Sequence, residues 1–377
     1  MIFVELFRFF SSSSKEKLNF VPKKIIIMNE TITLKCFADI DLNDTFFDSL
    51  KEDYPGFEAW FQKKSENNSK AYVQYTENNL QAFLYLKDES GEELTDVTPM
   101  RPACNRLKVG TFKIDAHNTK LGERFVKKIM DTALFKKAEE IYVTIFPKHD
   151  GLIRILQRYG FNEEGKKGDE IVLVKNMRAI TGDILKDYPL IKTIDKRKFL
   201  LSIYPKYHTQ MFPDSILRNE ESLKYELVKD NSYTNSIHKI YLCFMPDTAQ
   251  LQRGDIIAIY RTKDDKGAAR YRSVITSVCQ IEEVKTNKDF ANVEEFLSYT
   301  NFYSIFNPEE LKQWYRQKNC YVLKMTYNIA LTKRVTNGYM VDELKMAPQY
   351  WGFFQLTDEQ FDAILKKGEV DESVIIN

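Results

Sequence analysis

The sequence lacks the clusters of cysteine and histidine that indicate a zinc site or a disulfide framework. Its five cysteines are scattered and odd in number, and no Cys-x-x-Cys pair occurs. Reduced thiols are the simple interpretation, so we expect a cytoplasmic protein that holds no metal. The formal net charge is only +1, which excludes an overall attraction to nucleic acid or to an acidic membrane. Binding to either would need a local patch of basic residues on the surface.

The sequence also lacks an N-terminal run long enough to span a membrane. Residues 1–10 are apolar but are interrupted by Glu5 and Arg8, and four serines follow. The run has no basic start and no small-residue cleavage site, so it does not resemble a secretory signal. We expect residues 1–27 to be a disordered upstream extension and a first domain to begin at Met28. A chain of 377 residues is long for one domain, and two or three are expected.

The most informative stretch begins with a strand predicted over residues 106–115. Apolar side chains alternate along it, but the alternation slips by one residue at Gly110-Thr111. The side chains on either side of the slip are Leu107, Val109, Phe112 and Ile114. A slip of one residue in a period-two pattern is typical of a β-bulge. A bulge separates a strand from its neighbour and leaves backbone groups available for a ligand.

A helix, a strand and a second helix are predicted after the bulged strand. Residues 121–134 carry apolar side chains every three or four positions, as on one face of a helix. Residues 141–146 indicate a buried strand that ends before Pro147, and the second helix ends at Gly160. Upstream, we expect a strand within 31–40, helices over 44–64 and a hairpin over 71–86. A strand over 170–175 closes this mainly antiparallel α/β domain.

This order of elements resembles the cofactor-binding half of the GNAT superfamily of acetyl-CoA-dependent N-acyltransferases, over about residues 31–178. In that family an Arg/Gln-x-x-Gly-x-Gly/Ala turn before the first helix holds the CoA pyrophosphate through backbone N–H groups. Gly122 matches the first glycine, whereas Thr119 and Arg124 stand where Arg or Gln and the second small residue are usual. The resemblance implies acetyl-CoA as co-substrate. The implied cofactor-binding residues are Phe112, Lys113, Ile114, Lys120, Leu121, Gly122, Glu123, Arg124 and Phe125. A plain strand–turn–helix with solvated side chains is the alternative.

The catalytic residues that the resemblance implies depart from the family pattern. The family often has Asn after the next strand and a Tyr general acid four residues before the glycine of Gly-Phe. In this sequence His149 and Leu156 occupy these positions. The candidate proton donors are therefore His149 and Tyr159, although each has an ordinary structural role as an alternative. The absence of the usual Tyr leaves open a domain that binds cofactor without turnover.

The remainder of the chain predicts a second domain, joined by a linker over 179–198 that packs along the surface. A strand ending in Ser-Ile-Tyr-Pro at 202–205 and a Gly-Asp turn before residues 256–261 resemble ASCH-type domains of the PUA-like superfamily. The resemblance covers about residues 199–330, and we expect residues 199–377 to form a β-barrel with a helical tail. The fold class is thus an α/β GNAT fold with a mixed sheet, followed by a PUA-like barrel.

Basic and aromatic residues alternate in a predicted loop of this second domain, as they do in RNA-binding surfaces. The candidate nucleic-acid contacts in this loop, residues 261–272, are Arg261, Lys263, Arg270 and Arg272. Lys206 is a further candidate, because it follows Pro205, where the ASCH resemblance implies the cleft of the barrel. A solvated hairpin loop is the alternative.

Two functions are consistent with the whole sequence. One is transfer of an acetyl group to an amine acceptor that the second domain selects, with an amine carried on RNA as one candidate. The other is a nucleic-acid-binding regulator of toxin–antitoxin type with a degenerate, non-catalytic GNAT domain.

Overall fold

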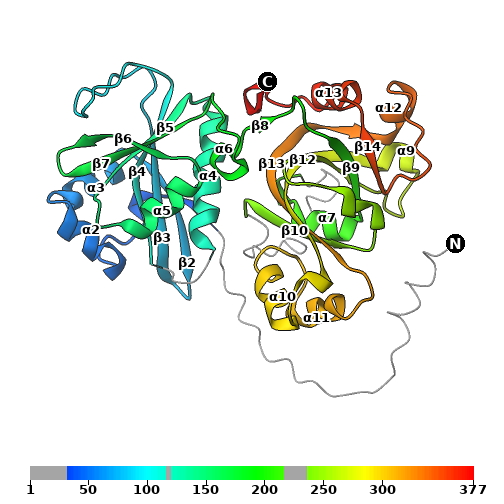
Figure 1. Ribbon diagram of the computed structural model, residues 1–377. Helices are drawn as coiled ribbons and strands as arrows, with labels where there is room; N and C mark the ends of the chain where they lie inside the picture. The colour runs from blue at the N-terminus through cyan, green and yellow to red at the C-terminus, as the bar shows by residue number, and fades with distance from the viewer. Residues whose placement is uncertain (1–31, 116–119, 216–235) are drawn as a thin grey trace.

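The computed structural model describes residues 32–115, 120–215 and 236–377, which form two domains side by side (Figure 1). The expected N-terminal extension, residues 1–27, lies outside the described residues, and so does Thr119 of the turn. The expected fold class is confirmed, because a mixed α/β domain is followed by a domain built on a curved, mainly antiparallel sheet. No helix in the described part of the chain is both long enough and apolar enough to cross a membrane.

The first domain is built on a seven-stranded sheet in the order β1-β2-β3-β4-β5-β7-β6. The strands are β1 (Thr33–Cys36), β2 (Lys70–Thr76), β3 (Asn79–Asp88), β4 (Arg106–Ile114), β5 (Glu140–Ile145), β6 (Asn162–Lys167) and β7 (Glu170–Asn176). Neighbouring strands are antiparallel except for β4 and β5, which run parallel. A parallel pair needs a crossover, and α4 (Leu121–Phe135) supplies it, as the sequence predicts.

Helices cover both faces of this sheet because its strands alternate apolar side chains between them. On β3, Ala82 and Leu84 face the core under α4 and α5 (Asp150–Arg158), whereas Phe83 and Tyr85 face a second, aromatic core. That second core lies under α2 (Asp48–Asp53) and α3 (Phe57–Glu66). Pro55 and Gly56 lie in the break between α2 and α3.

The predicted bulge is present at Gly110 of β4. Tyr85 pairs with Thr111 and Leu86 pairs with Val109, so Gly110 is the extra residue in the register. A Cβ atom at Gly110 would lie 2.8 Å from Cδ1 of the Tyr85 ring. Glycine therefore allows the aromatic core to approach the strand at the bulge.

The second domain is built on a six-stranded sheet in the order β10-β13-β12-β11-β9-β14. The strands are β9 (Lys198–Ile203), β10 (His238–Cys243), β11 (Ile256–Arg261), β12 (Val274–Thr286), β13 (Tyr321–Thr336) and β14 (Phe353–Leu356). Only β9 and β11 run parallel in this sheet. The helices are α7 (Pro205–Met211), α9 (Ala269–Arg272), α10 (Val293–Thr300), α11 (Pro308–Tyr315), α12 (Asn337–Asp342) and α13 (Asp358–Lys367). As expected, the C-terminal tail packs on this domain, through β14 in the sheet and α13 against its face.

The expected surface linker packs between the domains instead. It contains α6 (Ile184–Asp187) and β8 (Ile191–Lys192), and β8 pairs with β15 (Ile375–Ile376) at the C-terminus. Tyr188 and Leu190 are each 1% exposed, and the Tyr188 hydroxyl donates to the Tyr327 carbonyl over 3.1 Å. Tyr188 belongs to the core of the first domain and Ile191 to a core of the second, so the linker contributes to both.

Candidate functional site

A cavity of about 1080 Å³ opens in the first domain where β4 and β5 separate. The two strands pair only from Arg106–Glu140 to Val109–Val143, whereas β4 continues to Ile114. Beyond that point the strand edge lines the cavity with residues 109–115. The other walls are residues 143–145 of β5, the start of α4, residues 148–152 at the start of α5, and parts of α2 and α3. The bulge and the parallel pair therefore create the cavity together.

Most of the predicted cofactor-binding residues line this cavity. They are Phe112, Lys113, Ile114, Lys120, Gly122 and Glu123. Leu121 and Phe125 instead pack into the core under α4, and Arg124 is 4% exposed outside the lining. Of the predicted cofactor-binding residues, only the six that line the cavity can thus contact a ligand in it. A Cβ atom at Gly122 would meet only side-chain tips, with Cδ1 of Ile155 at 2.7 Å.

Lys113 fixes the strand edge to the opposite wall of the cavity. Its ammonium group donates to the Phe46 carbonyl and to the Ser49 hydroxyl, the latter over 2.7 Å, and it lies 4.7 Å from the centroid of the Phe46 ring. These contacts hold β4 against the start of α2. The Lys113 side chain is 17% exposed, so it acts as a structural tie beside the cavity.

His149 lies at the N-cap of α5 and faces Asp53 of α2 across the cavity wall. Its Nε2 atom is 3.2 Å from Oδ2 of Asp53, and Lys148 pairs with the other carboxylate oxygen. The Asp53 side chain is 11% exposed, whereas that of His149 is 36% exposed. A carboxylate that holds one ring nitrogen of a histidine fixes the tautomer and leaves the other nitrogen for proton transfer. Of the two candidate donors, His149 is the one at the cavity.

Asp53 and Tyr54 are cavity residues that the sequence patterns did not single out. The Tyr54 hydroxyl donates to Oε1 of Glu170 over 2.9 Å. Burial and this carboxylate raise the pKa of Tyr54 well above its usual value. Both residues stand at the break between α2 and α3, a segment that the sequence predicts only as helical. The Pro55-Gly56 break itself is the signal that points to the cavity.

Tyr159 lies outside the cavity, at the C-cap of α5. It is fully buried, and its hydroxyl lies 3.0 Å from Nε2 of His238 in the second domain. Burial raises the pKa of Tyr159, with Glu123 contributing. Tyr159 therefore does not reach a ligand in the cavity. Leu156, at the position where the family has its Tyr, is a core residue.

The five basic residues predicted to bind nucleic acid do not form one exposed patch. Arg261 is fully buried at the end of β11, so it cannot be part of such a patch. Nη1 of Arg270 lies 2.9 Å from Oδ1 of Asp342, and Arg272 pairs with Asp264. Lys206 stacks over the Tyr207 ring at 4.5 Å, and Lys263 is exposed. The loop also contains the short helix α9, which the sequence patterns did not predict.

Comparisons with known proteins reveal similarity at the level of solved structures. No protein-family model matches the sequence, and no curated protein matches it. Two kinds of solved structure are similar to parts of this chain. An N-acetyltransferase of Campylobacter jejuni, PseH, is 10% identical with a TM-score of 0.27, over 38% of this chain and 97% of its own. A GNAT family acetyltransferase from Elizabethkingia anophelis, solved with acetyl-CoA bound, is 13% identical with a TM-score of 0.30, over 39% and 98%.

The other similarity is to an ASCH protein of Zymomonas mobilis, 8% identical with a TM-score of 0.30, over 46% of this chain and 96% of its own. Solved structures of both kinds, GNAT and ASCH, are thus among the proteins to which this chain is similar. In the described residues no group of three or more His, Cys, Asp or Glu side chains is placed to hold a metal ion.

Proposed function

We propose that the chain is an acetyl-CoA-dependent N-acetyltransferase that acts on an amine. The cavity formed by the separation of β4 from β5 carries this proposal. The edge of β4 beyond Val109 can pair with the amide groups of an extended acyl-carrier arm, as a strand edge pairs with an added strand. The start of α4 borders the same cavity, and a helix N-terminus favours the phosphate groups at the other end of that arm.

The proposed reaction needs one proton to move from the amine to the departing thiolate. The amine nitrogen attacks the thioester carbonyl, a C–N bond forms, and the C–S bond breaks. His149 accepts the amine proton and delivers it to the sulfur, while Asp53 holds the imidazole through the 3.2 Å contact. Asp53 is therefore a positioning residue and His149 the catalytic residue.

The acceptor is proposed only as an amine that enters beside α2 and α3. This side of the cavity carries Asp53, Tyr54 and Trp60, which combine charge with aromatic surface. An amine attached to RNA is a narrower form of the proposal. The ion pairs of Arg270 and Arg272 and the burial of Arg261 give that form little support.

Release of free thiol from acetyl-CoA tests the proposal. The full chain is incubated with acetyl-CoA and a panel of polyamines, amino acids, peptides and aminoacyl-RNA. We expect at least one acceptor class to stimulate release, and His149→Gln to abolish it while acetyl-CoA still binds. Arg154→Gln is the matched control, because Arg154 is on the same helix but outside the cavity lining. Binding of acetyl-CoA with no release across the panel would favour the non-catalytic alternative.

A further inference from the structure

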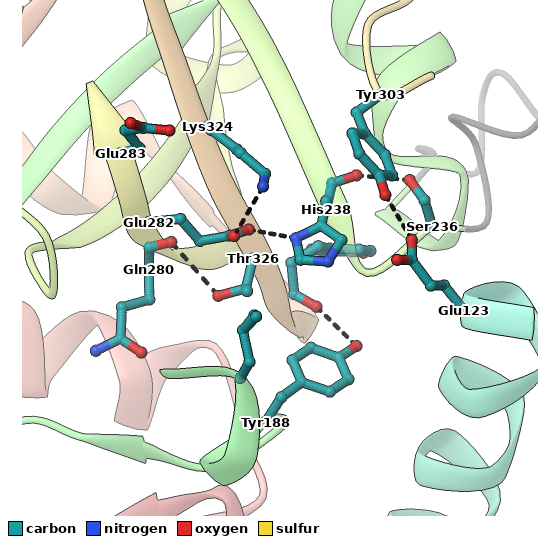
Figure 2. Close-up of polar contacts among 12 residues, drawn as sticks. Glu123, Tyr188, Ser236, His238, Gln280, Glu282, Glu283, Tyr303, Lys324 and Thr326 are labelled. Atoms are coloured by element: carbon teal, nitrogen blue, oxygen red, sulfur yellow. Dashed lines mark hydrogen bonds and ion pairs between the residues drawn. The ribbon is translucent and has the colours of Figure 1, made fainter. Parts of the chain in front are cut away.

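A short segment of the second domain contacts two of the charged side chains at the start of α4, Lys120 and Glu123. The Tyr303 hydroxyl donates to Oε2 of Glu123 over 2.6 Å, and the two side chains face each other across the domain boundary (Figure 2). The ammonium group of Lys120 lies 5.5 Å from the ring centroids of both Phe302 and Tyr303. Lys120 and Glu123 both line the cavity of the first domain. The second domain therefore contacts the phosphate-binding end of the proposed cofactor site.

Tyr303 is held firmly within the second domain. Its carbonyl accepts from the N–H of Ile240 on β10 over 2.9 Å, and its ring centroid lies 5.0 Å from that of His238. His238 in turn pairs with the buried Glu282, which lies 3.3 Å from Nζ of Lys324 (Figure 2). A buried, hydrogen-bonded network of this kind restricts its members to one arrangement. The Tyr303 hydroxyl is thus presented at a fixed position to α4.

The contact with Glu123 is the important one for an anionic ligand. Glu123 is 4% exposed, and its other oxygen lies 3.5 Å from Nη1 of Arg158. A carboxylate in the first turn of α4 repels phosphate groups bound at that turn. The Tyr303 hydroxyl holds the carboxylate toward the second domain, and the Arg158 guanidinium, from α5 of the first domain, offsets part of its charge. Without the hydroxyl, Glu123 would be freer to turn into the cavity.

The contact belongs to a longer interface along one face of α4. Glu123, Lys127 and Asp131 recur every four residues and therefore share that face. Lys127 pairs with Asp131 over 2.8 Å and lies 5.5 Å from the ring of Tyr327 on β13. A smaller cavity of about 250 Å³ lies between α4 and β13 further along. Figure 1 shows α4 on the side of the first domain that faces the second.

We propose that Tyr303 is a positioning residue of the acetyl-CoA site, through which the second domain sets cofactor affinity by holding Glu123 away from the phosphate groups. This inference rests on the proposed function. It assigns the second domain a role in the binding of acetyl-CoA, in addition to any role in selecting the acceptor.

Titration calorimetry of acetyl-CoA with four full-length proteins tests this inference: the unaltered protein, Tyr303→Phe, Glu123→Gln, and the double variant. We expect Tyr303→Phe to bind about tenfold more weakly, which corresponds to ~1.4 kcal/mol. Glu123→Gln should bind at least as tightly as the unaltered protein, because the repelling charge is gone. The double variant should bind like Glu123→Gln, since the hydroxyl acts only through the carboxylate.

Two outcomes would overturn the inference. Equal affinity in Tyr303→Phe and the unaltered protein would show that the hydroxyl has no effect on the site. Removal of the hydroxyl could also weaken acetyl-CoA binding by the same factor in the protein with Glu123 and in Glu123→Gln. That result would show that Tyr303 has a general structural role instead. Failure of the proposed function is distinguishable, because then the unaltered protein itself would not bind acetyl-CoA. Thermal unfolding of each variant establishes that it is folded.

Discussion

The Tyr159 hydroxyl lies 3.0 Å from Nε2 of His238, and this contact joins the end of α5 to β10 of the other domain. Both side chains are fully buried. His238 also pairs with Glu282, so the hydroxyl is one partner in a chain of buried polar groups. The residue that the sequence suggests as a proton donor therefore contributes to the domain interface.

Replacing Tyr159 by Phe should destabilise the protein without stopping the reaction. The change leaves Nε2 of His238 buried without this partner, which costs about 1–3 kcal/mol of unfolding free energy. Denaturant unfolding and thiol release together measure the two effects. Tyr271→Phe, at a residue that is 72% exposed, is the control and should change neither. If Tyr159→Phe were folded and bound acetyl-CoA but released no thiol, Tyr159 would again be a candidate proton donor.

Replacing Asp53 by Asn should slow the reaction more than it weakens cofactor binding. Asn cannot stabilise an imidazolium as a carboxylate does, so the proton transfer through His149 loses its support. We expect a fall of about 100-fold in kcat, the lower range for loss of acid–base catalysis. The affinity for acetyl-CoA, measured by calorimetry, should stay within a small factor. Lys148→Gln removes the other partner of Asp53 and is the control. An equal fall in both variants would mean that charge at the site, rather than positioning of His149, is what matters.

The bulge at Gly110 should be sensitive to a single added methyl group. In Gly110→Ala the new Cβ would lie 2.8 Å from the Tyr85 ring, which is packed in the aromatic core and cannot easily move. We expect a loss of about 1–3 kcal/mol in unfolding free energy, typical of overpacking, together with weaker acetyl-CoA binding. Gly151→Ala is the matched control for stability, because nothing lies within 4 Å of its Cβ position. A Gly110→Ala protein of unchanged stability would contradict the packing that the bulge implies.

His208 should make the protein less stable in mild acid. Its ring is fully buried, with Nε2 lying 2.7 Å from the Thr276 hydroxyl. Burial lowers the pKa of His208 to about 3, and the charges of Arg261 and Arg334 add to this. The unfolded chain takes up a proton on His208 near pH 6.5 and the folded chain does not, so stability falls as the pH drops through 6.5 toward 3. Between pH 7 and 4.5 this contribution amounts to roughly 2–3 kcal/mol.

Denaturant unfolding of the unaltered protein and of His208→Gln at both pH values isolates that contribution. Gln does not titrate but keeps a group able to hydrogen-bond with Thr276. The difference in unfolding free energy between the two proteins should therefore shift in favour of the variant as the pH falls. Parallel curves would show that His208 is not the group responsible.

The elements that border the cavity could be predicted because each carries a clear local pattern. The slip at Gly110, the four-residue apolar repeat of α4 and the apolar run of β5 are all visible in the chain. By contrast, β6 is a largely exposed, polar strand without alternation, so nothing local predicts it. The strand that carries His238, β10, was not predicted either.

The parts of the site that could not be predicted depend on tertiary contacts. Asp53 reaches His149 across the fold, and Glu123 reaches Tyr303 across the domain boundary. No periodic pattern of apolar residues along the sequence indicates which distant residues will be in contact. The same holds for Arg261, whose basic character suggests a surface patch although the curved sheet buries it.

Calorimetric titration of acetyl-CoA into the full chain and into Gly122→Glu tests the central claim most directly. The new Cβ atom would meet only the side-chain tips of Ile155 and Ile114, and the carboxylate adds a negative charge to the cavity at the start of α4. Lys128→Glu changes the charge of the same helix outside the cavity lining and is the control. Micromolar binding that is lost in Gly122→Glu and kept in Lys128→Glu is the result we predict. Absence of binding to the unaltered protein would contradict the proposed acetyltransferase site.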